Sequence, residues 1–164
     1  TYQDGALSGL VRIHNYFKDK VFEEEATFKN NKLNGIRRSY YPNKHVSVEE
    51  TYKDGLLDGT RRSYYENTRL NTEETYVHDR LNGPRKRYYD TGQLWNEEQY
   101  ENGQLNGTRF DYYISGQVRL EENYKAGRLE GKRVFYYENG KSMYEEMYTA
   151  GKLIDRKEFR KRGF

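Results

Sequence analysis

Positions 52–76 read YKDGLLDGTRRSYYENTRLNTEETY, and the layout of this segment recurs along the chain. One tyrosine returns at a constant interval, at Tyr52, Tyr76, Tyr100, Tyr124 and Tyr148. A fixed interval of about 20 to 50 residues is typical of repeat proteins, in which each repeat buries its apolar face by stacking on its neighbours. The sequence therefore predicts an array of about six repeats.

Each repeat reads as two short strands joined by tight turns. Within positions 52–76, Asp54-Gly55 forms one turn, the β-rich run 57–65 follows, residues 66–69 turn back, and residues 70–76 return. Glycine recurs in the same loop positions of other repeats, where it supplies the positive φ of tight hairpin turns. We predict a chain of antiparallel hairpins.

Alternation along the strands assigns side chains to the two faces of the sheet. We place Tyr65 opposite Leu70 across a four-residue loop, so that Arg61 faces Glu74. Cross-strand charge pairs of this kind specify the register of a sheet. The predicted pairs are Arg37 with Glu50, Arg61 with Glu74, Arg85 with Glu98, Arg109 with Glu122, and Arg133 with Glu146.

The same register sets a glycine opposite an aromatic ring in every repeat. A ring over a glycine covers bare backbone and keeps the glycine from weakening its strand. These pairs are Gly35 with Tyr52, Gly59 with Tyr76, Gly83 with Tyr100, Gly107 with Tyr124, and Gly131 with Tyr148. We expect a ladder of tyrosine, glycine and leucine to form the core.

One clean copy of the pattern consists of Leu105-Asn106-Gly107-Thr108-Arg109, Tyr112-Tyr113, Gly116, Glu121-Glu122 and Tyr124, and residues 129–148 hold another. In these residues the chain resembles the bacterial variant of the MORN repeat, the membrane occupation and recognition nexus. The resemblance covers nearly the whole chain. It implies an all-β fold, an elongated, single-layer antiparallel sheet of tandem hairpins.

We expect the repeat array to span residues 1–153. The first repeat departs from the pattern, with Tyr16-Phe17 as its aromatic pair and Ala26 in place of its second glutamate, and it is expected to form a cap. Residues 154–164 are basic. They are interpreted either as a last strand that protects the open sheet edge with charge, or as a contact for phosphate or anionic lipid.

Composition limits the class of protein. The chain has 164 residues, 29 basic and 26 acidic side chains, 18 tyrosines and no cysteine. No run of 18 apolar residues offers a transmembrane helix. We expect a soluble, cytoplasmic protein, although a chain that begins at Thr1 leaves a removed leader or a missing upstream region open.

The residues indicate no catalytic, cofactor or metal site. His14, His45 and His78 occupy insertion or turn positions in different repeats, so convergence on one metal is not expected. Neighbours such as Glu97 and Glu98 point to opposite faces of a strand and cannot act on one substrate. The glycines follow hairpin spacing and form no phosphate loop. We predict that the chain is not an enzyme.

Recognition is therefore sought where repeats differ. The face opposite the Arg–Glu pairs carries one tyrosine in each repeat, and there Phe110 and Val134 replace the basic residues of earlier repeats. We place Trp95 opposite Tyr88, Arg119 opposite Tyr112, and Met143 opposite Tyr136. Aromatic residues, methionine and arginine are enriched in protein interfaces. The candidate partner-binding residues are Tyr88, Trp95, Phe110, Tyr112, Arg119, Tyr136 and Met143. Coverage of this face by sheet curvature or by another copy is the alternative.

Four function classes follow. The first is a protein-binding module, and the resemblance implies the antitoxin of a bacterial toxin–antitoxin pair, which neutralises a toxin by binding it. The second is docking to anionic lipid through the basic C-terminal segment. Self-association through open edge strands is another. Nucleic-acid binding is disfavoured, because one row of glutamates shares the face of the candidate tyrosines: Glu49, Glu73, Glu97, Glu121 and Glu145.

Overall fold

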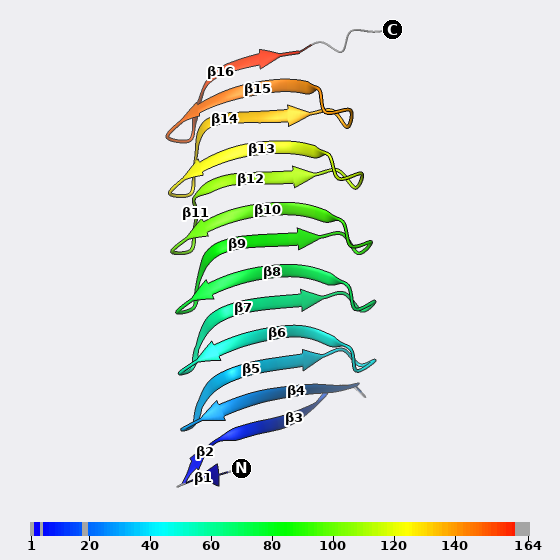
Figure 1. Cartoon of the computed structure of the whole chain (residues 1–164), viewed down its shortest axis with the longest axis vertical. Coiled ribbons are helices and arrows are strands. Elements are labelled where there is room, and N and C mark those ends of the chain that lie inside the picture. Colours follow the sequence, from blue (N-terminus) through cyan, green and yellow to red (C-terminus); the bar gives the residue numbers. More distant parts are fainter. Residues whose placement is uncertain (1, 4, 18–19, 160–164) are drawn as a thin grey trace. The chain divides into compact units, whose positions relative to one another are not determined.

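The computed structural model describes residues 2–3, 5–17 and 20–159, with side chains for residues 5–14 and 23–159 (Figure 1). The aromatic pair expected at Tyr16-Phe17 therefore has its side chains outside the described residues. The chain divides into two compact units, an N-terminal unit of residues 1–81 and a C-terminal unit of residues 82–164. Each is described by itself.

The N-terminal unit is built from antiparallel hairpins whose order in space follows their order in the chain. A small hairpin of β1 (Tyr2–Gln3) and β2 (Ala6–Leu7) comes first. The sheet then consists of β3 (Gly9–Phe17), β4 (Lys20–Lys29), β5 (Lys32–Tyr40), β6 (Val46–Lys53), β7 (Leu56–Tyr64) and β8 (Leu70–Val77).

The C-terminal unit has the same construction. Its strands are β9 (Arg80–Tyr88), whose first two residues precede the division, β10 (Leu94–Glu101), β11 (Gln104–Leu105), β12 (Gly107–Tyr112), β13 (Val118–Lys125), β14 (Arg128–Tyr136), β15 (Ser142–Thr149) and β16 (Lys152–Glu158). Both β11 and β12 pair with β10. The predicted all-β fold of antiparallel hairpin repeats is confirmed.

Tight turns join the hairpins as the sequence predicts. Asp54 and Gly55 have φ of 52° and 92°, and Asn102 and Gly103 have φ of 50° and 82°. Two successive positive φ angles define the turn type that suits the right-handed twist of paired strands. Some of these turns also bond to an earlier hairpin: the amides of Gly55, Gly127 and Gly151 donate to the carbonyls of Leu33, Leu105 and Leu129 at 2.8, 2.8 and 2.9 Å.

The predicted register is confirmed in the middle of every hairpin. Arg61 lies opposite Glu74 and Gly59 opposite Tyr76, and the other four Arg–Glu and Gly–Tyr pairs align in the same way. At the loop end the prediction is wrong. Tyr64, rather than Tyr65, faces Leu70, because a β-bulge leaves Asn71 outside the pairing.

The core also differs from the expected ladder of tyrosine, glycine and leucine. Buried apolar side chains among the described residues are Ala26, Leu120 and Val134. A row of glutamates from the Arg–Glu pairs is equally buried: Glu50, Glu74, Glu98, Glu122 and Glu146. Ala26 occupies the glutamate position of the first repeat. A single-layer sheet has few apolar neighbours to offer, so paired charges fill the most enclosed positions.

Candidate binding faces

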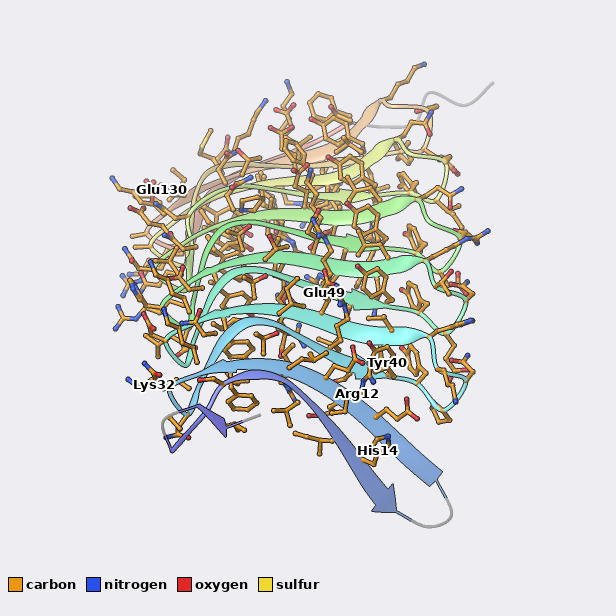
Figure 2. All side chains as sticks on the ribbon, turned by 60° about the horizontal axis from the view of Figure 1, so that its bottom comes forward. Arg12, His14, Lys32, Tyr40, Glu49 and Glu130 are labelled. Carbon is orange, nitrogen blue, oxygen red and sulfur yellow. The ribbon has the colours of Figure 1, made fainter. Side chains whose placement is uncertain are left out.

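The sheet of each unit has two chemically distinct faces. We call the first the arginine–glutamate face, which carries Arg37, Arg61, Glu50 and Glu74 in the N-terminal unit and Arg85, Arg109, Arg133, Glu98, Glu122 and Glu146 in the C-terminal unit. The second is the tyrosine face, which carries Tyr40, Tyr64, Glu25, Glu49 and Glu73 in the N-terminal unit and Tyr88, Tyr112, Tyr136, Glu97, Glu121 and Glu145 in the C-terminal unit. Figure 2 shows side chains projecting from both sides of the ribbon.

On the arginine–glutamate face, four glutamates each contact arginines of two successive hairpins: Glu50, Glu98, Glu122 and Glu146. Glu122 lies 3.1 Å from Arg109 Nη1 and 2.6 Å from Arg133 Nε, the latter an electrostatic contact because that N–H is not directed at an oxygen. The hydroxyl of Tyr124 donates to Glu122 at 3.0 Å. Burial and the Glu122 carboxylate raise the pKa of Tyr124. These contacts hold one repeat against the next and leave little of the glutamate for a ligand.

The second tyrosine of three doublets forms another link between repeats, which the sequence reasoning missed. The hydroxyl of Tyr41 donates to the carbonyl of Tyr64 at 2.6 Å, and that of Tyr113 donates to the carbonyl of Tyr136 at 2.7 Å. Tyr89 donates in the same way at 3.0 Å. The doublet itself is the sequence signal for this contact, because only the second tyrosine lies in the loop.

The tyrosine face of the N-terminal unit is neutralised by its own cations. Arg12 pairs with Glu25 at 2.7 Å, and the hydroxyl of Tyr40 donates to the same carboxylate at 2.9 Å. Hydrogen bonds from Arg12 and Tyr40 lower the pKa of Glu25. Arg38 pairs with Glu49 at 2.7 Å. This face therefore presents satisfied charge pairs.

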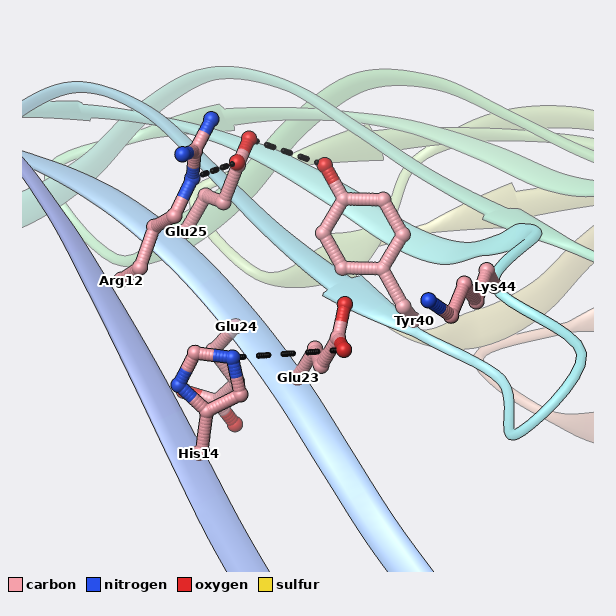
Figure 3. Close-up of a pocket in the computed structure, with 7 residues that line it drawn as sticks. All are labelled: Arg12, His14, Glu23, Glu24, Glu25, Tyr40 and Lys44. Atoms are coloured by element: carbon pink, nitrogen blue, oxygen red, sulfur yellow. Dashed lines mark hydrogen bonds and ion pairs between the residues drawn. The ribbon is translucent and has the colours of Figure 1, made fainter.

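A pocket opens on this unit, as Figure 3 shows. Its lining is Arg12, His14, Glu23, Glu24, Glu25, Tyr40 and Lys44. His14 Nε2 lies 4.0 Å from Glu23 Oε1. A second pocket is lined by Lys44, His45, Val46, Glu49, Tyr64 and Thr68. Among the described residues, no group of three or more His, Cys, Asp or Glu side chains is arranged to hold a metal ion.

The tyrosine face of the C-terminal unit has a different composition. Phe110 lies opposite Glu97 on one side and Glu121 on the other, and Val134 lies opposite Glu121 and Glu145. The rings of Phe110 and Tyr112 are 6.2 Å apart, and Val134 is buried. The row of charge pairs continues with Lys86–Glu97 and Lys132–Glu145, and between them it is interrupted by the side chains of Phe110 and Val134.

The candidate partner-binding residues do not form one patch. Leu94, not Trp95, faces Tyr88, and Val118, not Arg119, faces Tyr112. Trp95 and Arg119 are the extra residues of β-bulges, and Met143 is the extra residue between Ser142 and Tyr144. The predicted pairings of all three are therefore wrong, because a bulge changes which face a side chain reaches.

Trp95 and Arg119 lie on the arginine–glutamate face instead. The guanidinium carbon of Arg87 is 4.9 Å from the centroid of the Trp95 ring, and Arg87 also pairs with Glu98 at 3.1 Å. Arg119 pairs with Asp111 at 3.1 Å. Tyr112, Phe110 and Tyr136 remain on the tyrosine face, so the candidate set is divided between two surfaces.

Two polar residues of the arginine–glutamate face were not singled out from the sequence. Asn96 is completely buried and donates to Asp111 Oδ1 at 2.7 Å, while Arg87 Nε donates to Asn96 Oδ1 at 3.1 Å. Asp111 also pairs with Arg109 at 3.1 Å. The sequence signal that could have found them is that Asp111 and Asn96 replace the Ser63 and Thr72 of an earlier repeat. The cluster is internally satisfied and supports the fold.

In the segment 154–164, predicted as a basic strand or cap, residues 154–158 belong to β16, which is exposed along its whole length. Arg156 pairs with Glu146 at 3.4 Å and with Glu158 at 2.9 Å. Residues 160–164 lie outside the described part of the chain. In that described part, no helix has both the length and the apolar character needed to cross a membrane.

These features define a β-hairpin repeat protein. Its Arg–Glu pairs recur from repeat to repeat, while other surface residues differ between repeats. A family model described as the MORN repeat variant matches residues 33–54, 81–104, 105–126 and 129–150, more than half of the chain. The chain belongs to this MORN repeat family. Comparison with curated proteins gave no match. Repeat arrays of this type serve as binding modules, because adjoining copies create extended surfaces.

Proposed function

We propose that this chain is a non-catalytic protein-binding module and that it binds through the tyrosine face of the C-terminal unit. One observation carries the proposal. The row of cation–carboxylate pairs on this face is interrupted where Phe110 and Val134 take the positions of basic residues. The core of a protein interface is typically enriched in aromatic residues and depleted of charged ones.

Charge on the same face favours a protein over a phosphate-bearing partner. Glu97, Glu121 and Glu145 lie in one row there and repel a nucleic acid or an anionic lipid. Lipid docking through β16 has weaker support, because Arg156 is paired with two carboxylates and the ammonium of Lys157 lies over the ring of Phe159 at 4.7 Å.

Self-association is a second candidate, favoured by a specific observation. β16 is the last strand of its sheet in the described residues, and all seven of its residues are exposed. Such an edge can pair with another strand. Light scattering over a range of protein concentrations tests this candidate, and a monomer throughout would exclude it.

For the identity of the protein partner, we propose a toxin that the chain neutralises by direct binding, as the antitoxin of a bacterial toxin–antitoxin pair in the cytoplasm. The resemblance to the bacterial repeat variant supports this role, and so does a surface suited to protein contact. Co-expression with the product of the neighbouring gene tests it. Rescue of growth by the wild-type chain, with physical capture of that product, is expected.

The binding face is tested by a matched pair of double variants. Phe110→Ala/Tyr112→Ala removes the aromatic surface, and Arg62→Ala/Tyr64→Ala changes the equivalent positions of an earlier repeat. Affinity capture from native lysate should recover one dominant protein with the wild type and with the second variant, but not with the first. Equal recovery with both variants, each checked by circular dichroism, would contradict the proposal.

A further inference from the structure

Most carboxylates in the row on the tyrosine face have a basic residue of the same chain beside them. Glu25 lies between Arg12 and Arg38, and Glu49 lies between Arg38 and Arg62. In the C-terminal unit, Lys86 pairs with Glu97 at 3.5 Å and Lys132 with Glu145 at 3.1 Å. In this row, then, a basic residue normally lies beside each glutamate.

Glu121 differs from the rest of this row. Its neighbours across the strands are Phe110 on one side and Val134 on the other. The hydroxyl of Tyr136 donates to its Oε2 at 3.1 Å, as Tyr40 donates to Glu25. Within the described residues no cation forms an ion pair with Glu121. Glu121 therefore has the tyrosine contact of the earlier repeats but no basic residue beside it.

Nearby cations are already engaged elsewhere. Lys86 and Lys132 pair with the flanking carboxylates, and Arg119 is held by Asp111 on the arginine–glutamate face. The electrostatic surroundings of the tyrosines agree with this. Burial and Glu121 raise the pKa of Tyr136 and no cation opposes them, whereas Arg38 and Arg12 oppose the raised pKa of Tyr40.

We propose that an arginine side chain of the partner protein occupies this position and forms with Glu121 the ion pair that Arg38 forms with Glu49. This inference rests on the proposed function. The geometry in the earlier repeats defines the contact, since the Nε of Arg12, Arg38 and Arg62 donates to a glutamate at 2.7 Å, 2.7 Å and 2.9 Å. The partner thus completes a pattern that the chain interrupts.

The surroundings of Glu121 fit arginine better than lysine. Phe110 and Tyr112 offer ring surface on which a planar guanidinium can stack and along which its aliphatic stem can lie. A guanidinium also presents donors in a fixed plane that matches a carboxylate and is more weakly hydrated than an ammonium.

Short peptides provide the direct test. We would titrate the full chain with blocked tripeptides that carry arginine, lysine or citrulline between two alanines, and follow the methyl resonances of Val134 by NMR. Saturable shifts are expected with the arginine peptide, weaker ones with lysine, and none with neutral citrulline. Equal shifts with arginine and citrulline, or no saturable shift with arginine, would overturn the inference.

Three variants locate the contact. Glu121→Gln should weaken arginine-peptide binding about tenfold or more, because a charge-assisted hydrogen bond is lost. Phe110→Arg should abolish it by filling the position from within the chain. Glu49→Gln, the equivalent change in an earlier repeat, should leave the titration unchanged. Retained binding in Glu121→Gln would overturn the inference.

Capture of the partner separates this inference from the proposed function. A partner lost with both Glu121→Gln and Phe110→Ala/Tyr112→Ala supports both. A partner retained by Glu121→Gln but lost with the aromatic variant leaves the binding module standing and removes the arginine. A partner retained by both variants contradicts the tyrosine face as the binding surface, and the arginine with it.

Discussion

Single residues hold this sheet together by close approach and by burial of charge. Gly59 has φ of +133°, and a Cβ built there would lie 2.9 Å from the Cβ of Thr51 on the neighbouring strand. The glycine is therefore required by the backbone and by its neighbour, in addition to facing Tyr76. Glu122, which is 2 % exposed, shows the other device, a carboxylate enclosed by two arginines and a tyrosine.

Gly59→Ala should destabilise the N-terminal unit by roughly 1–3 kcal/mol, because the new methyl group meets Thr51 and the backbone conformation is strained. Gly55→Ala is the control, since its φ of +92° gives the strain while the nearest atom, Lys32 Cβ, is at an ordinary 3.8 Å. Urea unfolding followed by circular dichroism measures both. An equal loss in the two variants would show that Thr51 moves aside.

Glu122→Gln should lower the free energy of unfolding of the C-terminal unit by roughly 1–3 kcal/mol, because a buried charge-assisted hydrogen bond to Arg109 is lost while Asp111 and Glu146 still pair with the two arginines. Glu145→Gln removes a pair whose Lys132 side chain is 51 % exposed, so a loss below about 1 kcal/mol is expected. The comparison uses urea midpoints. Similar losses would mean that burial does not govern these pairs.

At the scale of the hairpin, the β-bulge determines which residues pair at the loop end and which face their side chains reach. Because the bulge adds one residue, Tyr65 leaves the ladder and its amide bonds to Arg69 within the loop at 2.8 Å. The same event in the C-terminal unit turns Trp95 toward Arg87 and Tyr89. It also places Tyr41, Tyr89 and Tyr113, each the second tyrosine of a doublet, where the hydroxyl reaches the following hairpin.

Tyr113→Phe should loosen the β14–β15 loop, because the Tyr136 carbonyl loses its donor. We expect the free energy of unfolding to fall by roughly 0.5–1.5 kcal/mol, and amide hydrogen exchange at residues 137–141 to become faster. Tyr112→Phe is the matched control, since its hydroxyl has no hydrogen bond among the described residues. Unchanged exchange in Tyr113→Phe would show that the hydrogen bond contributes nothing to loop order.

At the scale of the whole chain, tyrosines of both units share one electrostatic property. Burial, with neighbouring carboxylates, raises the pKa of Tyr40, Tyr52 and Tyr64 in the N-terminal unit and of Tyr112, Tyr124 and Tyr136 in the C-terminal unit. The folded chain thus favours the protonated phenol. A raised pKa contributes stability below the unfolded value, near 10, and this contribution is lost as pH rises through the folded value.

We therefore expect stability to be constant across neutral pH and to fall above about pH 10, as tyrosinate forms more readily in the unfolded chain. Ultraviolet absorbance of tyrosinate, recorded with circular dichroism over the same pH range, measures this. Tyrosinate should appear together with unfolding. Complete ionisation of the tyrosines while the sheet remains folded would contradict the expectation.

The sequence alone established the repeat, the hairpins and the register around Arg61 and Glu74, because these depend on turn residues and on strict alternation within one hairpin. The pairing of Tyr65 with Leu70 could not be predicted, since a bulge adds one residue without changing the pattern of residue types. The positions of Trp95 and Arg119, the burial of Glu122 and the lack of a cation beside Glu121 came from the folded structure. The positions of Trp95 and Arg119 depend on bulges within single hairpins. The burial of Glu122 and the surroundings of Glu121 depend on strands from two successive repeats, and such contacts exist only once the hairpins are packed together.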